Sequence, residues 1–135
     1  TSGGWFAPDT VPLASGVAII KYLIRVAVGE PVKVSDLAPT CHQAACQRYI
    51  IPGKSGLFDR LDGVSAARRM PGVKVLQLFR QPERGERIDK AQSNADRYGH
   101  LIAVGHDITE ATKRCESAMR KIRIVFQKKK TITRR

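Results

Sequence analysis

The first apolar residues of the chain recur at the spacing of one helix face. They are three to four residues apart, as on an amphipathic helix: Leu13, Val17, Ile20, Ile24 and Val28. We therefore predict one helix over residues 10–28, which Gly29 ends as the residue after the C-cap. Lys21 and Arg25 fall on the opposite, solvent-facing side of this helix.

Short apolar segments that alternate with turns follow a connector at residues 30–40. Their β-branched and aliphatic content predicts strands over residues 44–51, 57–61, 73–79, 101–104 and 122–126. Two further helices are predicted, over residues 64–70 and 109–119. The second has Asp107 or Thr109 as its N-cap and Glu110 in its first turn.

Helices and strands are mixed along the chain, and most of the links between strands are short. Short links join antiparallel strands. The predicted fold class is therefore α+β, an antiparallel sheet with flanking helices. The first helix belongs either to this sheet or to a neighbouring unit.

The length of 135 residues fits one domain, and no apolar run is long enough for a membrane span. The chain opens on Thr1 without the basic region of a signal peptide, which suggests the middle of a longer protein. Three cysteines, Cys41, Cys46 and Cys115, follow no disulfide framework. We interpret them as small buried apolar residues of a protein in the reducing cytoplasm.

The net charge of +12 is concentrated near the end of the chain. Eight basic residues and no acidic one lie at residues 120–135, which leaves 16 basic against 12 acidic residues before them. Such an end attracts phosphates, nucleic acid or anionic lipid, or simply aids solubility. Aromatic residues do not interleave with the charges, so the stacking platforms of a nucleic-acid-binding module are missing.

Two apparent motifs fail on spacing. Pro52-Gly53-Lys54-Ser55 resembles a phosphate-binding loop, but the glycine required five residues before Gly53 is Arg48. The segment is better explained as a tight turn. Cys41, His42 and Cys46 lack the second ligand pair of a zinc site. His100 and His106 flank a short strand, and we interpret the histidines as surface or strand-end residues.

Two segments resemble a known enzyme family. Ser2-Gly3-Gly4-Trp5, with the apolar helix after it, resembles the stretch that follows the metal-binding motif of ATP-grasp enzymes. The second segment contains Met70-Pro71-Gly72-Val73, Ala95-Asp96-Arg97-Tyr98-Gly99-His100 and Thr109-Glu110-Ala111. It resembles the C-terminal subdomain of L-amino acid ligases. Together the two cover residues 2–126.

The resemblance implies an ATP-dependent ligase. In this family ATP phosphorylates a carboxylate, an amine attacks the acylphosphate, and ADP and phosphate leave. ATP and Mg²⁺ are then bound mainly by parts of the enzyme outside this chain, so the chain alone is expected to be inactive. It also implies three segments: the end of the catalytic core with a connector (residues 1–40), the C-terminal subdomain (41–126) and a basic tail (127–135).

The resemblance assigns candidate site residues one by one. Gly3 and Gly4 correspond to the loop beside the acylphosphate, where missing side chains allow close approach. Trp5 resembles a tryptophan that closes the pocket for the first amino acid, or else it fills the edge of the core. Arg48 lies near the place of a catalytic arginine of biotin carboxylase-like members, or else it is an exposed strand residue.

The expected partners are the remainder of the ligase and small amino acid substrates, with a homodimer as a further possibility. No specific nucleic acid or membrane partner is expected. Two other classes stay open from the residues alone: a small basic nucleic-acid-binding module, and a non-catalytic interaction domain that uses the apolar helix. The substrate pair and the product are open.

Overall fold

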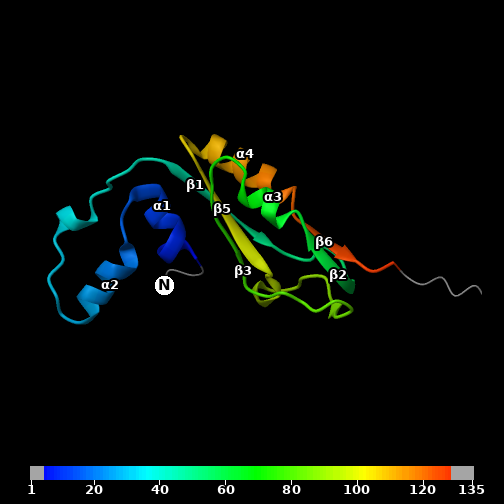
Figure 1. Ribbon diagram of the computed structural model, residues 1–135. Coiled ribbons are helices and arrows are strands. Elements are labelled where there is room, and N and C mark those ends of the chain that lie inside the picture. Colours follow the sequence, from blue (N-terminus) through cyan, green and yellow to red (C-terminus); the bar gives the residue numbers. More distant parts are fainter. Residues whose placement is uncertain (1–4, 129–135) are drawn as a thin grey trace, which may run out of the picture.

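The computed structural model describes residues 5–128 of the chain. Four short helical segments come first: η1 (Phe6–Thr10), α1 (Val11–Ser15), α2 (Ile19–Ala27) and η2 (Val34–Leu37). The remaining elements are β1 (Ala44–Ile50), β2 (Gly56–Asp62), α3 (Val64–Arg68), β3 (Val73–Leu78), β4 (Arg87–Ile88), η3 (Asn94–Asp96), β5 (Gly99–Gly105), α4 (Ile108–Met119) and β6 (Arg123–Phe126). All are labelled or can be followed by colour in Figure 1.

The prediction of one helix over residues 10–28 is wrong, because Gly16 divides it. Gly16 has a φ of 76°, in the left-handed region that ends helices, and α2 starts only at Ile19. The connector that follows α2 returns to this break. There the backbone N–H groups of Thr40 and Cys41 donate to the Ser15 carbonyl, at 2.8 and 3.2 Å. The break therefore joins the N-terminal helices to the start of β1.

The strands form two antiparallel sheets of three strands, ordered β1-β5-β3 and β4-β2-β6. This confirms the predicted α+β class with an antiparallel arrangement, although the strands divide over two sheets. The 52–55 segment is a turn, as predicted, and it links β1 to β2 in the other sheet. Residues 88–95, which showed no clear pattern, include the end of β4 and the first two residues of η3.

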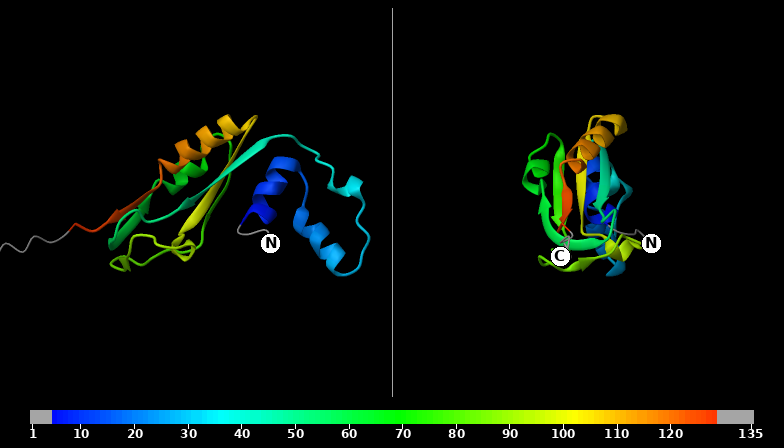
Figure 2. Two further views of the ribbon diagram at one scale, coloured as in Figure 1. Left: turned by 180° about the vertical axis from the view of Figure 1, so that it is seen from behind. Right: turned by 90° about the vertical axis from the view of Figure 1, so that its right-hand side faces the viewer.

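Helix α4 covers one face of the sheet β1-β5-β3. Strand residues that alternate along the sheet, such as Cys46, Leu101 and Ala103, pack against Ala111 and Cys115 of α4. Asp107 caps the helix as predicted, since its carboxylate accepts from the Glu110 N–H at 2.8 Å. We call this the closed face, and Figure 2 shows α4 lying along it.

The N-terminal segment lies at the other face. Successive strand residues point to opposite sides of a sheet, so Gln47, Tyr49, His100 and Ile102 face away from α4. The Thr10 hydroxyl of η1 reaches this side and donates to Gln47 Oε1 at 3.2 Å. We call it the open face, because η1 and α1 cover only part of it (Figures 1 and 2).

Helix α2 extends beyond both sheets and none of its residues is buried. Its apolar residues remain exposed, including Leu23 at 49% and Ile24 at 59%. Each helix within residues 5–128 is too short or too polar to cross a bilayer.

Candidate functional site

A cluster of aromatic rings lies on the open face, and we call it the aromatic cluster: Trp5, Tyr49, Phe79 and His100. The Trp5 and Phe79 rings are stacked, with centroids 5.3 Å apart and planes 17° from parallel. His100 meets both edge-on, at 5.2 Å from each. Tyr49 lies at 6.2 Å from His100. Trp5 and Tyr49 are half-buried and Phe79 is 38% exposed, so a ligand can reach this surface.

The sheet register brings these rings together from distant parts of the chain. Tyr49 of β1 and His100 of β5 are directly paired across the two strands. Phe79 follows β3, and its N–H donates to the Tyr98 carbonyl at 2.9 Å. Thr10 holds the N-terminal segment in place, because its hydroxyl contacts both Gln47 and the Trp5 carbonyl.

His100 is fully buried, with 0% exposure. Its interpretation as a surface residue is therefore wrong, while it does lie near an end of a strand, as the second residue of β5. Its Nδ1 is 2.8 Å from Gln47 Nε2, and burial lowers its pKa below the ordinary value of 6.5, against a smaller raising effect of Asp9. The signal that sequence reasoning missed is the position of His100 at the start of an apolar run that forms a buried strand.

Arg97 adds a positive charge beside the cluster. Its guanidinium lies 3.7 Å above the Tyr49 ring centroid, a cation–π distance, and it donates to Asn94 Oδ1 at 2.6 Å. Asp96 holds a turn just before β5, since its carboxylate accepts from the N–H groups of Gln92 and Ser93. Arg97 thus has a place beside the aromatic rings that its position in a turn did not suggest.

Arg48 lies on the side of the closed face. Its guanidinium pairs with Glu116 of α4 at 3.4 Å, and the two side chains are 47% and 49% exposed. By strand alternation it points away from Trp5, which is at the open face. Its catalytic role stays a prediction. Gly3, Gly4 and residues 129–135 of the basic tail lie outside the described residues.

The prediction that the cysteines are buried is confirmed for Cys46 and Cys115, whereas Cys41 is half-buried. Cys41 Sγ contacts the Ala14 carbonyl at 3.5 Å. Within residues 5–128, no group of three or more His, Cys, Asp or Glu side chains is arranged to hold a metal ion.

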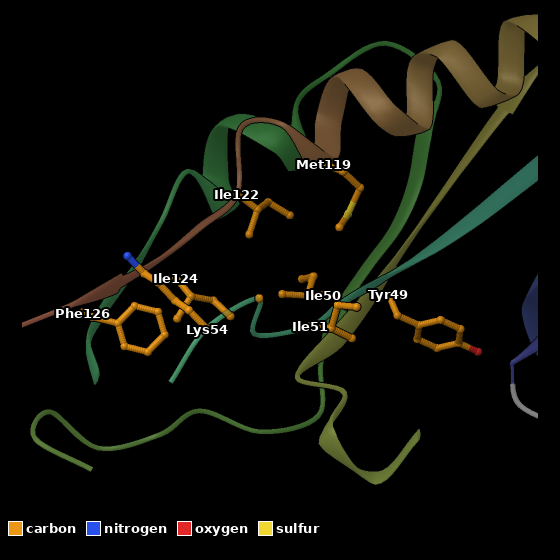
Figure 3. A pocket seen from close by; sticks show the side chains of 9 residues that line it. Tyr49, Ile50, Ile51, Lys54, Met119, Ile122, Ile124 and Phe126 are labelled. Atoms are coloured by element: carbon orange, nitrogen blue, oxygen red, sulfur yellow. The ribbon is translucent and has the colours of Figure 1, made fainter. Parts of the chain in front are cut away.

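An apolar hollow of about 410 Å³ lies at the other end of β1. Its aliphatic and aromatic lining comes from β1, α4 and β6: Ile50, Ile51, Met119, Ile122, Ile124 and Phe126. Figure 3 shows these side chains grouped together, with Tyr49 pointing away from them. Lys54 lies 5.4 Å from the Phe126 ring, and among residues 5–128 it is the only charged residue that lines the hollow. The hollow therefore offers less recognition chemistry than the aromatic cluster.

Several solved structures share this fold. Three of them are phosphoribosylglycinamide synthetase from Anaerococcus prevotii (TM-score 0.70, 19% identity), L-amino acid ligase from Bacillus licheniformis (0.69, 20%) and N5-carboxyaminoimidazole ribonucleotide synthetase from Thermotoga maritima (0.59, 15%). The similarity covers 90%, 88% and 87% of this chain, but only 30%, 29% and 29% of those chains.

The sequence comparisons agree with the fold. An uncharacterized protein of Sinorhizobium fredii, y4rH, is 30% identical over 115 residues, which are 85% of this chain and 23% of that protein. The chain thus spans about a quarter of this relative. Residues 48–127 match the family described as L-amino acid ligase C-terminal domain 2. The chain therefore belongs to that family, and its fold is that of part of the three solved structures above.

Proposed function

We propose that the chain supplies one wall of the substrate site in a ligase that joins the carboxylate of an amino acid to an amine. The reaction passes through an acylphosphate and releases ADP and phosphate. The observation that carries this proposal is the aromatic cluster, in which Trp5, Tyr49 and Phe79 remain partly accessible, on a chain of the family of L-amino acid ligase C-terminal domain 2.

Trp5 is the proposed contact with the side chain of the first amino acid. Its indole is half-buried and stacked on Phe79, so one face is supported while the remaining surface stays available to an apolar side chain. Gly3 and Gly4 directly precede it, and we assign them to the backbone that approaches the acylphosphate. Arg97 supplies a cation beside the cluster, suited to a carboxylate.

ATP and Mg²⁺ are proposed cofactors of the complete enzyme. Within residues 5–128 no group of three or more His, Cys, Asp or Glu side chains could hold a metal ion, and from the family resemblance we assign both cofactors to the remainder of the ligase. When bound, they supply the phosphoryl group and the charge stabilisation of its transfer. This chain's own contribution is to bind and orient the amino acid and to exclude water from one side.

The apolar side of α2 supports docking of that remainder. Ile20, Leu23 and Ile24 lie at helical spacing and are 40%, 49% and 59% exposed. Exposed apolar surface of this kind marks interaction sites. The relatives with solved structures have about 70% of their chains beyond the matched part. We therefore propose that residues 1–40 belong with the catalytic core, 41–126 form the C-terminal subdomain, and 127–135 form a basic tail.

The test is ADP release with ATP and Mg²⁺ against a panel of L-amino acids. We expect amino-acid-dependent ADP from the complete reading frame that contains this segment, and none from the 135-residue chain. The products identify the substrate pair. Absence of amino-acid-dependent ADP from the complete protein would contradict the proposed activity.

The pocket role of Trp5 is tested in the complete ligase with Trp5→Ala. Removing the indole enlarges the pocket, so larger first amino acids should be accepted, with a change in relative kcat/KM of about tenfold or more. Phe6→Ala is the matched control, because Phe6 is an exposed neighbouring aromatic residue outside the cluster. An unchanged substrate panel in Trp5→Ala argues against the pocket role.

A further inference from the structure

His100 is a buried polar residue at the centre of the open face. It lies on the middle strand of its sheet and is paired with Tyr49 on one side and Gln77 on the other. Its Nε2 is the only buried side-chain nitrogen or oxygen within residues 5–128 that has no hydrogen-bond partner. Such an atom costs stability in a folded protein, so its retention here requires an explanation.

Hydrogen bonds determine the protonation state of the ring. The Thr10 hydroxyl donates to Gln47 Oε1 at 3.2 Å, which turns the amide nitrogen of Gln47 toward His100. Gln47 Nε2 then donates to His100 Nδ1 at 2.8 Å. Nδ1 is therefore the acceptor of a neutral imidazole, whose proton is on Nε2. An added proton on Nδ1 would face the Gln47 N–H and remove this bond.

The ring geometry connects His100 to Trp5. The His100 plane is inclined by 73° to Trp5 and by 62° to Phe79, at 5.2 Å from each. These edge-to-face contacts are a preferred geometry of aromatic pairs. Since Phe79 stacks on the Trp5 ring, the indole is held by two rings from different directions. It cannot rotate without losing both contacts.

We propose that His100 is the positioning residue of Trp5, and that as a neutral ring it holds the indole in the orientation that meets the substrate side chain. This inference rests on the proposed function for its substrate part, whereas the contact between the two rings is independent of any substrate. This role explains why Nε2 has no partner. The His100 ring packs against the rings of Trp5 and Phe79, and this packing places no hydrogen-bond acceptor beside Nε2.

The surroundings oppose protonation of His100. Burial lowers its pKa, and Asp9 of η1 acts in the opposite direction with a smaller effect. Tyr49 of β1 is a titratable ring next to it, at 6.2 Å between centroids, and Arg97 lies over that ring, 3.7 Å from its centroid. At neutral pH the ring is therefore uncharged. Acid introduces an imidazolium beside the indole, and an imidazolium in contact with an indole quenches its fluorescence.

The first test uses the 135-residue chain, in which Trp5 is the single tryptophan and the histidines are His42, His100 and His106. Emission excited at 295 nm is followed from pH 8 to 4.5. We expect quenching with a midpoint below 6.5, absent in His100→Gln and retained in His106→Gln. Because His100→Gln can fail to fold, His100→Phe is a second variant that keeps an aromatic ring without a titrating group. Circular dichroism confirms folding of each.

A change at Gln47 sharpens this test. Gln47→Glu places a carboxylate 2.8 Å from the imidazole, which favours the protonated ring and should shift the quenching midpoint upward. Gln43→Glu is the matched control, because Gln43 bonds to the Leu13 carbonyl and not to His100. Its midpoint should not move. A wild-type titration without quenching, or one that survives in His100→Phe, overturns the proposal.

The second test measures substrate selection in the complete ligase. His100→Phe should raise KM for the first amino acid by about fivefold to tenfold with little change in kcat, since the ring acts on binding. In the Trp5→Ala background the same change should have no further effect, because the residues act as one unit. An undiminished effect in that background contradicts positioning through Trp5.

The two proposals can fail separately. If Trp5→Ala leaves the substrate panel unchanged while quenching still depends on His100, the proposed pocket role of Trp5 is wrong, but the contact between the His100 and Trp5 rings remains supported.

Discussion

The two faces of the sheet β1-β5-β3 share the same three strands but carry different chemistry. The closed face is built from small apolar residues, among them Cys46 and Ala103, which let α4 approach closely. The open face carries Gln47 and Tyr49 from β1 and His100 from β5, together with the rings of Trp5 and Phe79. Because successive residues of a strand point to opposite sides of the sheet, one set of alternate residues forms the packed closed face. The other set forms the candidate binding surface of the open face.

The two faces also differ in their titratable groups. On the closed face, burial first and the neighbouring Cys46 second raise the pKa of Cys115 to about 12, so this thiol stays protonated and unreactive. On the open face, burial lowers the pKa of His100 below its ordinary value of 6.5. Only the open face is thus expected to respond to pH within the ordinary working range of a protein.

The largest expected effect comes from removing a side chain of the closed face. Leu101 is fully buried between the sheet and α4, so Leu101→Ala should cost about 2–5 kcal/mol of unfolding free energy by leaving a cavity. Urea denaturation followed by circular dichroism measures this. Leu57→Ala is the matched control: Leu57 is 46% exposed, and its loss should be about 0.5 kcal/mol or less. Equal losses at both positions would contradict the dense packing of the closed face.

A smaller loss is expected when one carbon is added to the closed face. A Cβ on Gly105 would lie 2.5 Å from the backbone nitrogen of Ala111, and backbone cannot move as a flexible side chain can. Gly105→Ala should therefore destabilise the chain by about 1–3 kcal/mol through overpacking. A Cβ on Gly53 meets no atom within 4 Å. Thermal unfolding of Gly53→Ala should match wild type, and a comparable stability of the two variants would rule out tight contact between β5 and α4.

Much of this arrangement could be predicted from local patterns. The apolar segments at 44–51, 73–79 and 101–104 correspond to β1, β3 and β5, because strands with buried faces are rich in aliphatic residues. The Asp107 cap and the 109–119 helix were also predicted. The division into two sheets was not, since pairing depends on which strands meet in space and not on their spacing in the chain.

The helical prediction and the candidate site show where such patterns are insufficient. Residues 10–28 keep helical spacing across Gly16, but the left-handed conformation of this residue separates α1 from α2. Trp5 was a candidate from the resemblance, whereas Phe79 and His100 were not. Nothing near them in the sequence indicates that they contact Trp5, because the contacts span more than 70 residues and arise from strand register.

The pH response should distinguish the faces further. The pKa of His100 is below 6.5 in the folded chain and ordinary in the unfolded chain, so below pH 6.5 the unfolded state binds more protons. The contribution of His100 to stability should be constant above pH 6.5 and should fall as the pH drops from 6.5 to the folded-state pKa. Below the folded-state pKa it should not change any further. Urea midpoints at pH 7.5 and 5 measure the fall.

The control for this response is the pair His100→Phe and His106→Gln. His100→Phe should remove the fall above about pH 4.5, while His106→Gln, at an exposed position, should keep it. The carboxylates that favour the folded state titrate lower, because hydrogen bonds from Arg84 lower the pKa of Asp59 and backbone hydrogen bonds lower that of Asp96. A fall that persists in His100→Phe would place its origin outside the open face.

The smallest effect is expected for the ion pair beside the closed face. Arg48 and Glu116 are about half exposed and 3.4 Å apart, so solvent screens the pair and Arg48→Ala should cost no more than about 1 kcal/mol. A double-mutant cycle with Glu116→Ala measures the coupling, and the more exposed pair of Arg87 and Asp89 is its matched control. A coupling above about 1 kcal/mol would contradict an exposed pair.

The same Arg48→Ala change in the complete ligase then separates its two proposed roles. A loss of kcat of about a hundredfold or more identifies a catalytic arginine. Full turnover with the small loss of stability assigns Arg48 only to the contact between β1 and α4, and leaves the open face as the proposed substrate contact of this sheet.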